Sequence, residues 1–190
     1  MGKREYEIVV QNKHINMNEF KSKLKKIGGS IVQKEQIFYY LVYDHPLKKK
    51  NYYIRIRSEG FKLTMTVKTN TNEKYPIENE ITIDNFKEAN KILLELGCKK
   101  KFQIHKLREV WKIKGCKEIV FDTYPGMETY AEIECDNPKN IQKVLKKLNL
   151  DTNLKNYPRF PVAKYYLDTY GIKTRRKYND LTFTTAYKEL

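Results

Sequence analysis

The stretch YYIRIRSEGFKLTMTVKT, residues 52–69, decides the fold because apolar and polar side chains alternate along both of its halves. Arg55 and Arg57 alternate with isoleucines in the first half, and lysines and threonines alternate with apolar residues in the second. A period of two is typical of a strand with one apolar and one polar face. Glu59 and Gly60 form a tight turn between the halves. The stretch therefore predicts an antiparallel hairpin with a cationic face.

The same alternation recurs along the chain and predicts eight strands. They are residues 3–11, 31–44, 52–58, 61–69, 74–84, 102–114, 118–124 and 129–136. Helical patterns follow at a segment that begins at Asn16 or Asn18, and at 85–96, 138–148 and 162–170. Two sets of strands, each accompanied by a helix, predict an α+β fold: an eight-stranded antiparallel sheet that closes into a β-barrel, with flanking helices. We assign residues 1–172 to one domain and 173–190 to a basic C-terminal tail.

The composition excludes several classes of protein. The chain has 190 residues, with 38 Lys and Arg against 23 Asp and Glu, and a net charge of +15. Its longest apolar run, residues 37–43, is much shorter than the ~20 residues of a membrane-spanning helix, so no membrane partner is expected. Cys98, Cys116 and Cys135 are odd in number and widely spaced. We therefore expect no disulfide, no structural zinc, and a reducing, cytoplasmic setting.

Like charges occur in pairs, two residues apart, on one face of five predicted strands. The pairs are Glu5 with Glu7, Arg55 with Arg57, Glu78 with Glu80, Lys106 with Arg108, and Glu132 with Glu134, and Asp122 adds a carboxylate on a sixth strand. A solvated sheet face explains any single pair, but repulsion between like charges makes six such segments unexpected on a plain surface.

The two signs of charge indicate two kinds of ligand. Paired carboxylates are hard oxygen donors suited to Mg²⁺ or Mn²⁺. Paired Arg and Lys suit phosphate oxygens, and Arg is scarce in this chain, with 7 Arg among its 38 basic residues. Three of those seven are Arg55, Arg57 and Arg108, which favours a phosphate site on this face.

As an ordered set, these motifs resemble the CYTH superfamily of triphosphate tunnel metalloenzymes, which includes class IV adenylate cyclases and thiamine triphosphatases. The set is Glu5-Tyr-Glu7, Tyr53-Ile-Arg55-Ile-Arg57, Leu63 to Lys68, Glu78-Asn-Glu80, Lys106-Leu-Arg108, Phe121-Asp122 and Tyr130-Ala-Glu132-Ile-Glu134. The resemblance covers about residues 3–170 and implies a barrel whose lumen binds a triphosphate through basic residues and one or two divalent cations through acidic ones.

The resemblance also implies roles for individual residues. The substrate-binding set is Arg55, Arg57, Lys62, Lys68, Lys106, Arg108 and Lys164, the last in Ala163-Lys164-Tyr165. The metal-binding set, for Mg²⁺ or Mn²⁺, is Glu5, Glu7, Glu80, Asp122, Glu132 and Glu134. Glu5, Glu7 and Lys68 are the expected catalytic residues.

The sequence departs from the family at Val9, where the signature Glu-x-Glu-x-Lys has its lysine. Three explanations stay open: another lysine such as Lys62 or Lys164 compensates, the substrate differs, or the protein binds without turnover. The presence of both carboxylate pairs and both cation pairs favours compensation.

We expect a metal-dependent phosphohydrolase acting on tripolyphosphate, a nucleoside triphosphate or thiamine triphosphate. One alternative is a class IV-type adenylate cyclase that makes cyclic AMP and pyrophosphate from ATP. Another is RNA: the 5′ end as substrate of an RNA 5′-triphosphatase, or RNA binding at the basic clusters 48–50, 99–101, 146–147 and 173–177. A homodimer also stays open.

Overall fold

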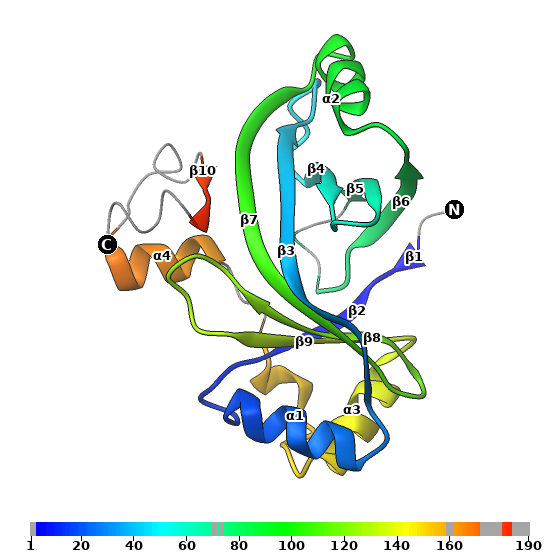
Figure 1. Ribbon diagram of the computed structural model, residues 1–190, viewed down its shortest axis with the longest axis vertical. Helices are drawn as coiled ribbons and strands as arrows, with labels where there is room; N and C mark the ends of the chain where they lie inside the picture. Colours follow the sequence, from blue (N-terminus) through cyan, green and yellow to red (C-terminus); the bar gives the residue numbers. More distant parts are fainter. Residues whose placement is uncertain (1–2, 70–71, 73, 159–161, 172–179, 184–190) are drawn as a thin grey trace. The chain divides into compact units, whose positions relative to one another are not determined.

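The computed structural model describes residues 3–69, 72, 74–158, 162–171 and 180–183 (Figure 1). The chain divides into two compact units. Unit 1 comprises Met1–Arg4, Ile37–Lys106 and Pro161–Leu190, and unit 2 comprises Glu5–Gln36 and Leu107–Phe160. Because most of residues 172–190 lie outside the described ranges, the basic C-terminal tail stays a prediction.

Unit 1 is built on antiparallel strands with a helix packed against one face. Its elements are β1 (Lys3–Arg4), β4 (Tyr52–Ser58), β5 (Leu63–Thr69), β6 (Ile77–Ile83), β10 (Asp180–Leu181), α2 (Phe86–Glu95), α4 (Val162–Tyr170) and parts of β3 (Ser30–Asp44) and β7 (Lys99–Lys112). Leu41, Ile54 and Ile56 of the strands form a core with Ala89 and Leu93 of α2. This packing turns the opposite face of β4, which carries its arginines, away from the core.

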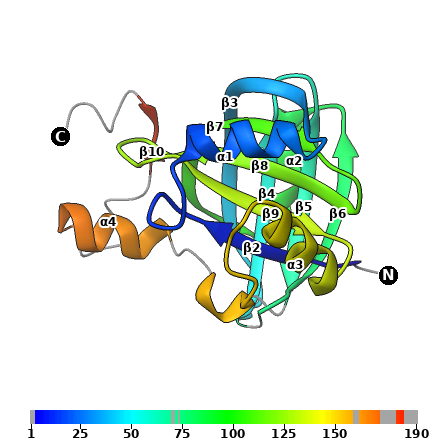
Figure 2. The ribbon, with the colours of Figure 1, turned by 90° about the horizontal axis from the view of Figure 1, so that it is seen from below.

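Unit 2 is built on antiparallel strands whose apolar face is covered by two helices. Its elements are β2 (Tyr6–Val10), β8 (Cys116–Thr123), β9 (Tyr130–Cys135), α1 (Met17–Lys26), α3 (Pro138–Lys147), the 3₁₀-helix η1 (Leu154–Asn156) and the remaining parts of β3 and β7. Figures 1 and 2 show α1 and α3 on the same side of these strands. Phe20 of α1 and Ile141 of α3 are fully buried in one core with Ile119, Phe121 and Ile133. The polar residues of β8 and β9 consequently occupy the other face.

The strand order confirms the predicted α+β fold with an antiparallel sheet. Hydrogen-bonded neighbours follow the order β1-β6-β5-β4-β3-β7-β8-β9-β2, and every pair with a described register is antiparallel except β10 with β7. The predicted strand 3–11 is two strands: residues 3–4 pair with β6, and residues 6–10 pair with β9. Alternation predicts a strand but not its partners, which is why the division at Glu5 was missed.

Helix ends follow the capping signals of the sequence. The Asn16 side chain accepts hydrogen bonds from the backbone N–H groups of Asn18 and Glu19, at 3.0 and 3.3 Å, and Asn16 rather than Asn18 is therefore the N-cap of α1. Pro138 occupies the first turn of α3, where its missing N–H costs no helical hydrogen bond. None of the described helices has the length and apolar character needed to cross a membrane.

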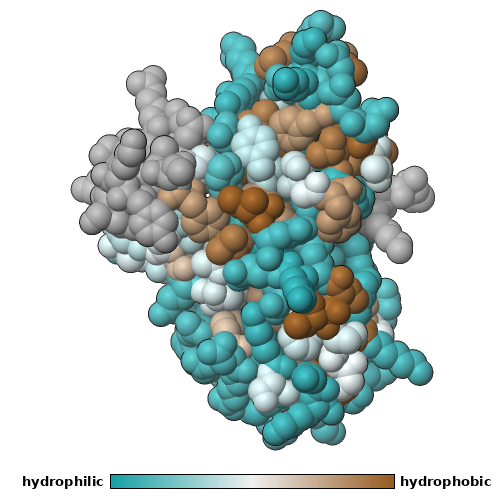
Figure 3. All heavy atoms as spheres, in the orientation of Figure 1, coloured by the Kyte–Doolittle hydropathy of each residue, from teal (hydrophilic) through white to brown (hydrophobic). Residues whose placement is uncertain are grey.

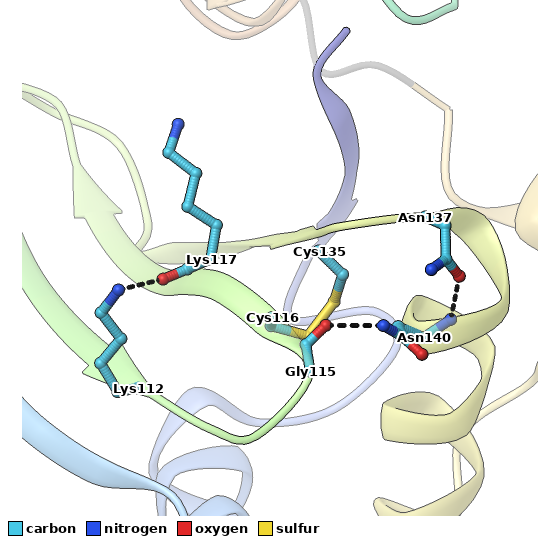
Figure 4. The surroundings of a disulfide bond; sticks show 7 residues. All are labelled: Lys112, Gly115, Cys116, Lys117, Cys135, Asn137 and Asn140. Carbon is cyan, nitrogen blue, oxygen red and sulfur yellow. Dashed lines mark hydrogen bonds between the residues drawn. A yellow bond between two sulfur atoms is a disulfide. The ribbon is translucent and has the colours of Figure 1, made fainter. Parts of the chain in front are cut away.

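The predicted absence of a disulfide is wrong, because Cys116 and Cys135 are bonded to each other (Figure 4). They are 19 residues apart in sequence but face each other across the antiparallel pair β8–β9. Spacing in sequence could not reveal this register. Cys98 is the free, buried cysteine. The cytoplasmic setting, which rested in part on unpaired cysteines, loses that support and stays a prediction.

Candidate functional site

The polar face of unit 1 consists of three rows of cross-strand neighbours on β4, β5 and β6. The rows are Arg57, Thr64 and Thr82; Arg55, Thr66 and Glu80; and Tyr53, Lys68 and Glu78. The period-two pattern places these side chains on one face, and the register places the cations of β4 and β5 beside the carboxylates of β6.

Ion pairs and hydrogen bonds connect these rows. Arg55 Nη2 lies 3.4 Å from Glu78 Oε1, and Arg57 Nη2 lies 3.4 Å from Glu80 Oε2. Thr66 donates its hydroxyl to Glu80 at 2.9 Å and accepts from Arg55 Nε at 3.4 Å. Two lysines complete the cluster: Lys68 lies 3.8 Å from Glu78, and Lys62 lies 3.6 Å from Glu80. Four predicted phosphate ligands are thus gathered in unit 1.

Burial makes this cluster electrostatically strong. Desolvation lowers the pKa of Arg55, but electrostatic interactions with Tyr53 and Glu78 outweigh it and raise the pKa above its ordinary value. Desolvation raises the pKa of Tyr53, so its phenol stays protonated near neutral pH. A fixed guanidinium of this kind suits phosphate oxygens, which it can bind with two parallel N–H groups.

Glu59 belongs to this cluster and was missed by the sequence analysis. Its carboxylate lies 2.5 Å from Arg57 Nη2, and the residue is 9% exposed. Glu59 lies in the hairpin turn, one residue beyond the end of β4, so it was read as part of the turn and not as a member of the charged face. The only signal in the sequence was its position two residues after Arg57.

The two remaining predicted phosphate ligands of unit 1 have different environments. Lys106 on β7 is 4% exposed. Lys164 on α4 is exposed, and its ammonium lies 2.8 Å from Asp168, one helical turn further along. Lys106 therefore resembles the arginines of β4 in its burial, whereas Lys164 pairs within its own helix.

In unit 2, Arg108 brings two predicted metal ligands together. Its guanidinium donates from Nε to Asp122 Oδ1 at 2.6 Å and from Nη2 to Asp122 Oδ2 at 2.5 Å. The same Nη2 lies 3.2 Å from Glu132 Oε2. Asp122 is completely buried and Arg108 is 7% exposed. Burial lowers the pKa of Arg108, but its interactions with Asp122 and Glu132 raise it well above the ordinary value.

The polar face of unit 2 that carries Asp122 and Glu132, here called the carboxylate face, continues onto β2 through the register of β2 with β9. Glu7 is the cross-strand neighbour of Glu134, and Val9 is the neighbour of Glu132. Glu134 Oε1 also lies 2.9 Å from Lys117 Nζ. Glu5, which precedes β2, is 6% exposed, as is Val9. Val9 thus lies on the carboxylate face, where the family signature has its lysine.

The predicted metal-binding carboxylates have the donor chemistry of a divalent-metal site, although they are not clustered around one position. Among the residues that the structure describes, no group of three or more His, Cys, Asp and Glu side chains is placed to hold an ion. Asp122 and Glu132 nevertheless converge on one nitrogen of Arg108, as carboxylates do around a cation. Their hard oxygen donors are those that Mg²⁺ and Mn²⁺ prefer.

The comparisons establish the family. The model of the CYTH domain matches residues 5–166, so the chain belongs to the CYTH domain family. The chain is 26% identical over 180 residues to a protein of Methanocaldococcus jannaschii named "Putative adenylate cyclase MJ0240". That match covers 87% of this chain and 99% of the relative.

Solved structures share the fold at low sequence identity. The X-ray structure of a "putative adenylate cyclase" from Vibrio parahaemolyticus matches with a TM-score of 0.70 and 16% identity, covering 89% of this chain and all of that one. HpAC1 from Hippeastrum, described as having a dominant triphosphatase activity, matches with a TM-score of 0.51 and 16% identity. That match covers 88% of this chain and 96% of HpAC1.

Proposed function

We propose that this chain is a divalent-metal-dependent triphosphatase that releases phosphate from a triphosphate compound. The observation that carries the proposal is the arginine pair Arg55 and Arg57, both little exposed and on one face with Lys68. Buried guanidinium groups bind phosphate oxygens with two N–H groups each, and a nearby ammonium adds a point charge. The triphosphatase activity described for HpAC1 makes tripolyphosphate the first substrate to test.

Residues of both units take part in the proposed reaction. Arg55, Arg57, Lys62, Lys68, Lys106, Arg108 and Lys164 bind the phosphates. Glu5, Glu7, Glu80, Asp122, Glu132 and Glu134 would hold Mg²⁺ or Mn²⁺, which supplies neutralisation of charge on the phosphoryl oxygens and a water of lowered pKa. Carboxylate oxygens of Glu5 and Glu7 orient the attacking water and accept its proton, and the Nζ of Lys68 stabilises charge on the leaving oxygens.

A closed barrel is part of this proposal. One N-terminal segment supplies β1, which pairs with β6 in unit 1, and β2, which pairs with β9 in unit 2. In the strand order, β1 is the first strand and is followed by β6, and β2 is the last strand and is preceded by β9. Pairing of one segment with both of these strands supports closure, since a barrel joins the two edges of its sheet.

Adenylate cyclisation is the second candidate, favoured by the name of the M. jannaschii relative. In this reaction the ribose 3′-hydroxyl of ATP attacks the α-phosphate and pyrophosphate leaves. Chromatography of the products from ATP separates the two reactions. Cyclic AMP with pyrophosphate indicates the cyclase, and ADP with phosphate indicates the triphosphatase.

A substrate panel with Mg²⁺ and with Mn²⁺ tests the proposal. Tripolyphosphate, nucleoside triphosphates, thiamine triphosphate and an RNA with a 5′-triphosphate are assayed for phosphate release. Glu5→Gln/Glu7→Gln is the matched variant because it keeps side-chain size and removes two carboxylates. We expect wild-type turnover and loss of activity in the variant. The absence of phosphate release from every substrate would contradict the proposal. Full activity in the variant would show that Glu5 and Glu7 neither bind the metal nor orient the attacking water.

A further inference from the structure

A groove with a cationic rim lies in unit 2 between the end of β7 and α3, apart from the proposed phosphate and metal ligands. Its volume is about 420 Å³. It is lined by Ile113, Lys114, Asn140, Lys143, Val144, Lys146 and Lys147. Ile113 and Val144 are buried, and the four lysines are not. The groove thus has an aliphatic floor and a rim of ammonium groups.

The positive charge of this rim is not neutralised by the described part of the protein. None of the four lysines forms an ion pair with a described residue, and α3 itself contains no acidic residue. Lys143 and Lys147 are four residues apart on the helix, a spacing at which like charges repel. Other lysines have carboxylate partners: Lys101 lies 2.6 Å from Asp44, and Lys117 lies 2.9 Å from Glu134. An uncompensated cluster around a cavity indicates an anionic ligand.

The wall of the groove opposite α3 is held in place by several contacts (Figure 4). Asn140 donates its side-chain N–H to the carbonyl of Gly115 at 3.0 Å. Gly115 has φ = +90°, a conformation that suits glycine, and Asn140 Nδ2 lies 3.5 Å from where its Cβ would be. The disulfide of Cys116 then fixes the start of β8 to β9. The groove is therefore formed before a ligand arrives, which lowers the entropy cost of binding.

We propose that this groove binds the sugar-phosphate backbone of a single-stranded nucleic acid. Lys143 and Lys147 are separated by about 6 Å along α3, and Lys114 adds a charge on the other wall, so the ligand must carry repeated negative charges. Lysines bind phosphates as point charges without reading a sequence. A protein partner would need an exposed aromatic or large apolar anchor, and no lining residue supplies one. Figure 3 shows mostly hydrophilic atoms over the helical part of unit 2.

This inference is independent of the proposed triphosphatase activity. It is tested with fluorescently labelled oligouridine of about twelve nucleotides bearing a 5′-hydroxyl, which offers no triphosphate to the candidate active site. Binding is followed by anisotropy over a range of salt concentrations for the wild type and for Lys143→Gln/Lys146→Gln/Lys147→Gln. Lys13→Gln/Lys25→Gln/Lys26→Gln is the matched control because it removes the same charge from exposed lysines of unit 2 that lie outside the groove and outside the basic clusters. Thermal unfolding confirms that both variants are folded.

The expected result is salt-dependent binding that the α3 variant weakens about tenfold at low salt and the control variant leaves nearly unchanged. In a plot of the logarithm of the association constant against the logarithm of salt concentration, the slope should become less steep by about 2 in the α3 variant. The variant removes three lysines, and each phosphate contact on a single strand contributes about 0.7 to the slope. Oligothymidine should bind as well as oligouridine, because both present the same phosphates. No binding at low salt, equal losses in both variants, or equal affinity for polyglutamate would overturn the proposal; the last result would indicate an acidic protein partner instead.

Discussion

At the scale of single residues, the buried pair Arg108 and Asp122 is the strongest electrostatic feature of unit 2. Asp122 has no exposed surface, and both of its oxygens accept hydrogen bonds from the guanidinium. Removing one partner of a buried ion pair leaves the other charge without compensation, whereas removing both is much less harmful. The pair therefore matters to folding as well as to the proposed reaction.

Asp122→Asn should accordingly lower the free energy of unfolding by about 3 kcal/mol, the usual cost of an uncompensated buried charge. Urea unfolding at neutral pH measures the change. The same substitution is then made in an Arg108→Met background, where its cost should be clearly smaller. Equal losses in the two backgrounds would show that the two residues do not act as a pair.

A substitution at Val9 distinguishes between the explanations for the departure from the family signature. It lies opposite Glu132 and is 6% exposed, so a lysine there would place its ammonium on the carboxylate face. If other lysines compensate, Val9→Lys should change kcat for tripolyphosphate by less than about threefold. A gain of more than about tenfold would instead show that the natural chain binds substrate and lacks a cation needed for turnover.

At the scale of elements, the sequence patterns predicted most strands and helices because alternation and capping are local. The helix over 138–148 and the hairpin over 52–69 correspond to α3 and to β4–β5. Strand pairing is not local. The sequence patterns therefore did not predict the division of the first strand at Glu5, the disulfide between Cys116 and Cys135, or the short strand β10. The same limit applies to the site: alternation reveals which residues share a face, but a turn residue such as Glu59 is found only from its contact with Arg57.

The disulfide between β8 and β9 should contribute about 3 kcal/mol to stability, the value expected for a closed loop of about this length. Cys116→Ser/Cys135→Ser should therefore unfold at a lower urea concentration than the oxidised wild type. Dithiothreitol should bring the wild type to the level of the variant and leave the variant unchanged. Thiol titration of the unfolded, unreduced wild type should find one thiol, that of Cys98; three thiols would contradict the disulfide.

At the scale of the whole molecule, the net charge of +15 does not reside in the candidate site. Six cations and seven carboxylates of the charged strand faces nearly cancel: Arg55, Arg57, Lys62, Lys68, Lys106, Arg108, Glu5, Glu7, Glu78, Glu80, Asp122, Glu132 and Glu134. The excess lies elsewhere, in clusters such as the lysines of α3. Such a surface would raise the rate at which the proposed anionic substrates arrive, whereas the proposed chemistry depends on the nearly balanced set.

The most direct measurement of the central claim is phosphate release from tripolyphosphate with Mg²⁺, compared between the wild type and Arg55→Gln/Arg57→Gln. Lys48→Gln/Lys49→Gln, which loses the same charge outside the site, is the control. The account predicts metal-dependent release by the wild type and the control, and a loss of at least about a hundredfold in kcat/KM in the arginine variant, which lacks two charge-assisted phosphate contacts. Equal rates in all three proteins, or no release by the wild type, would contradict it.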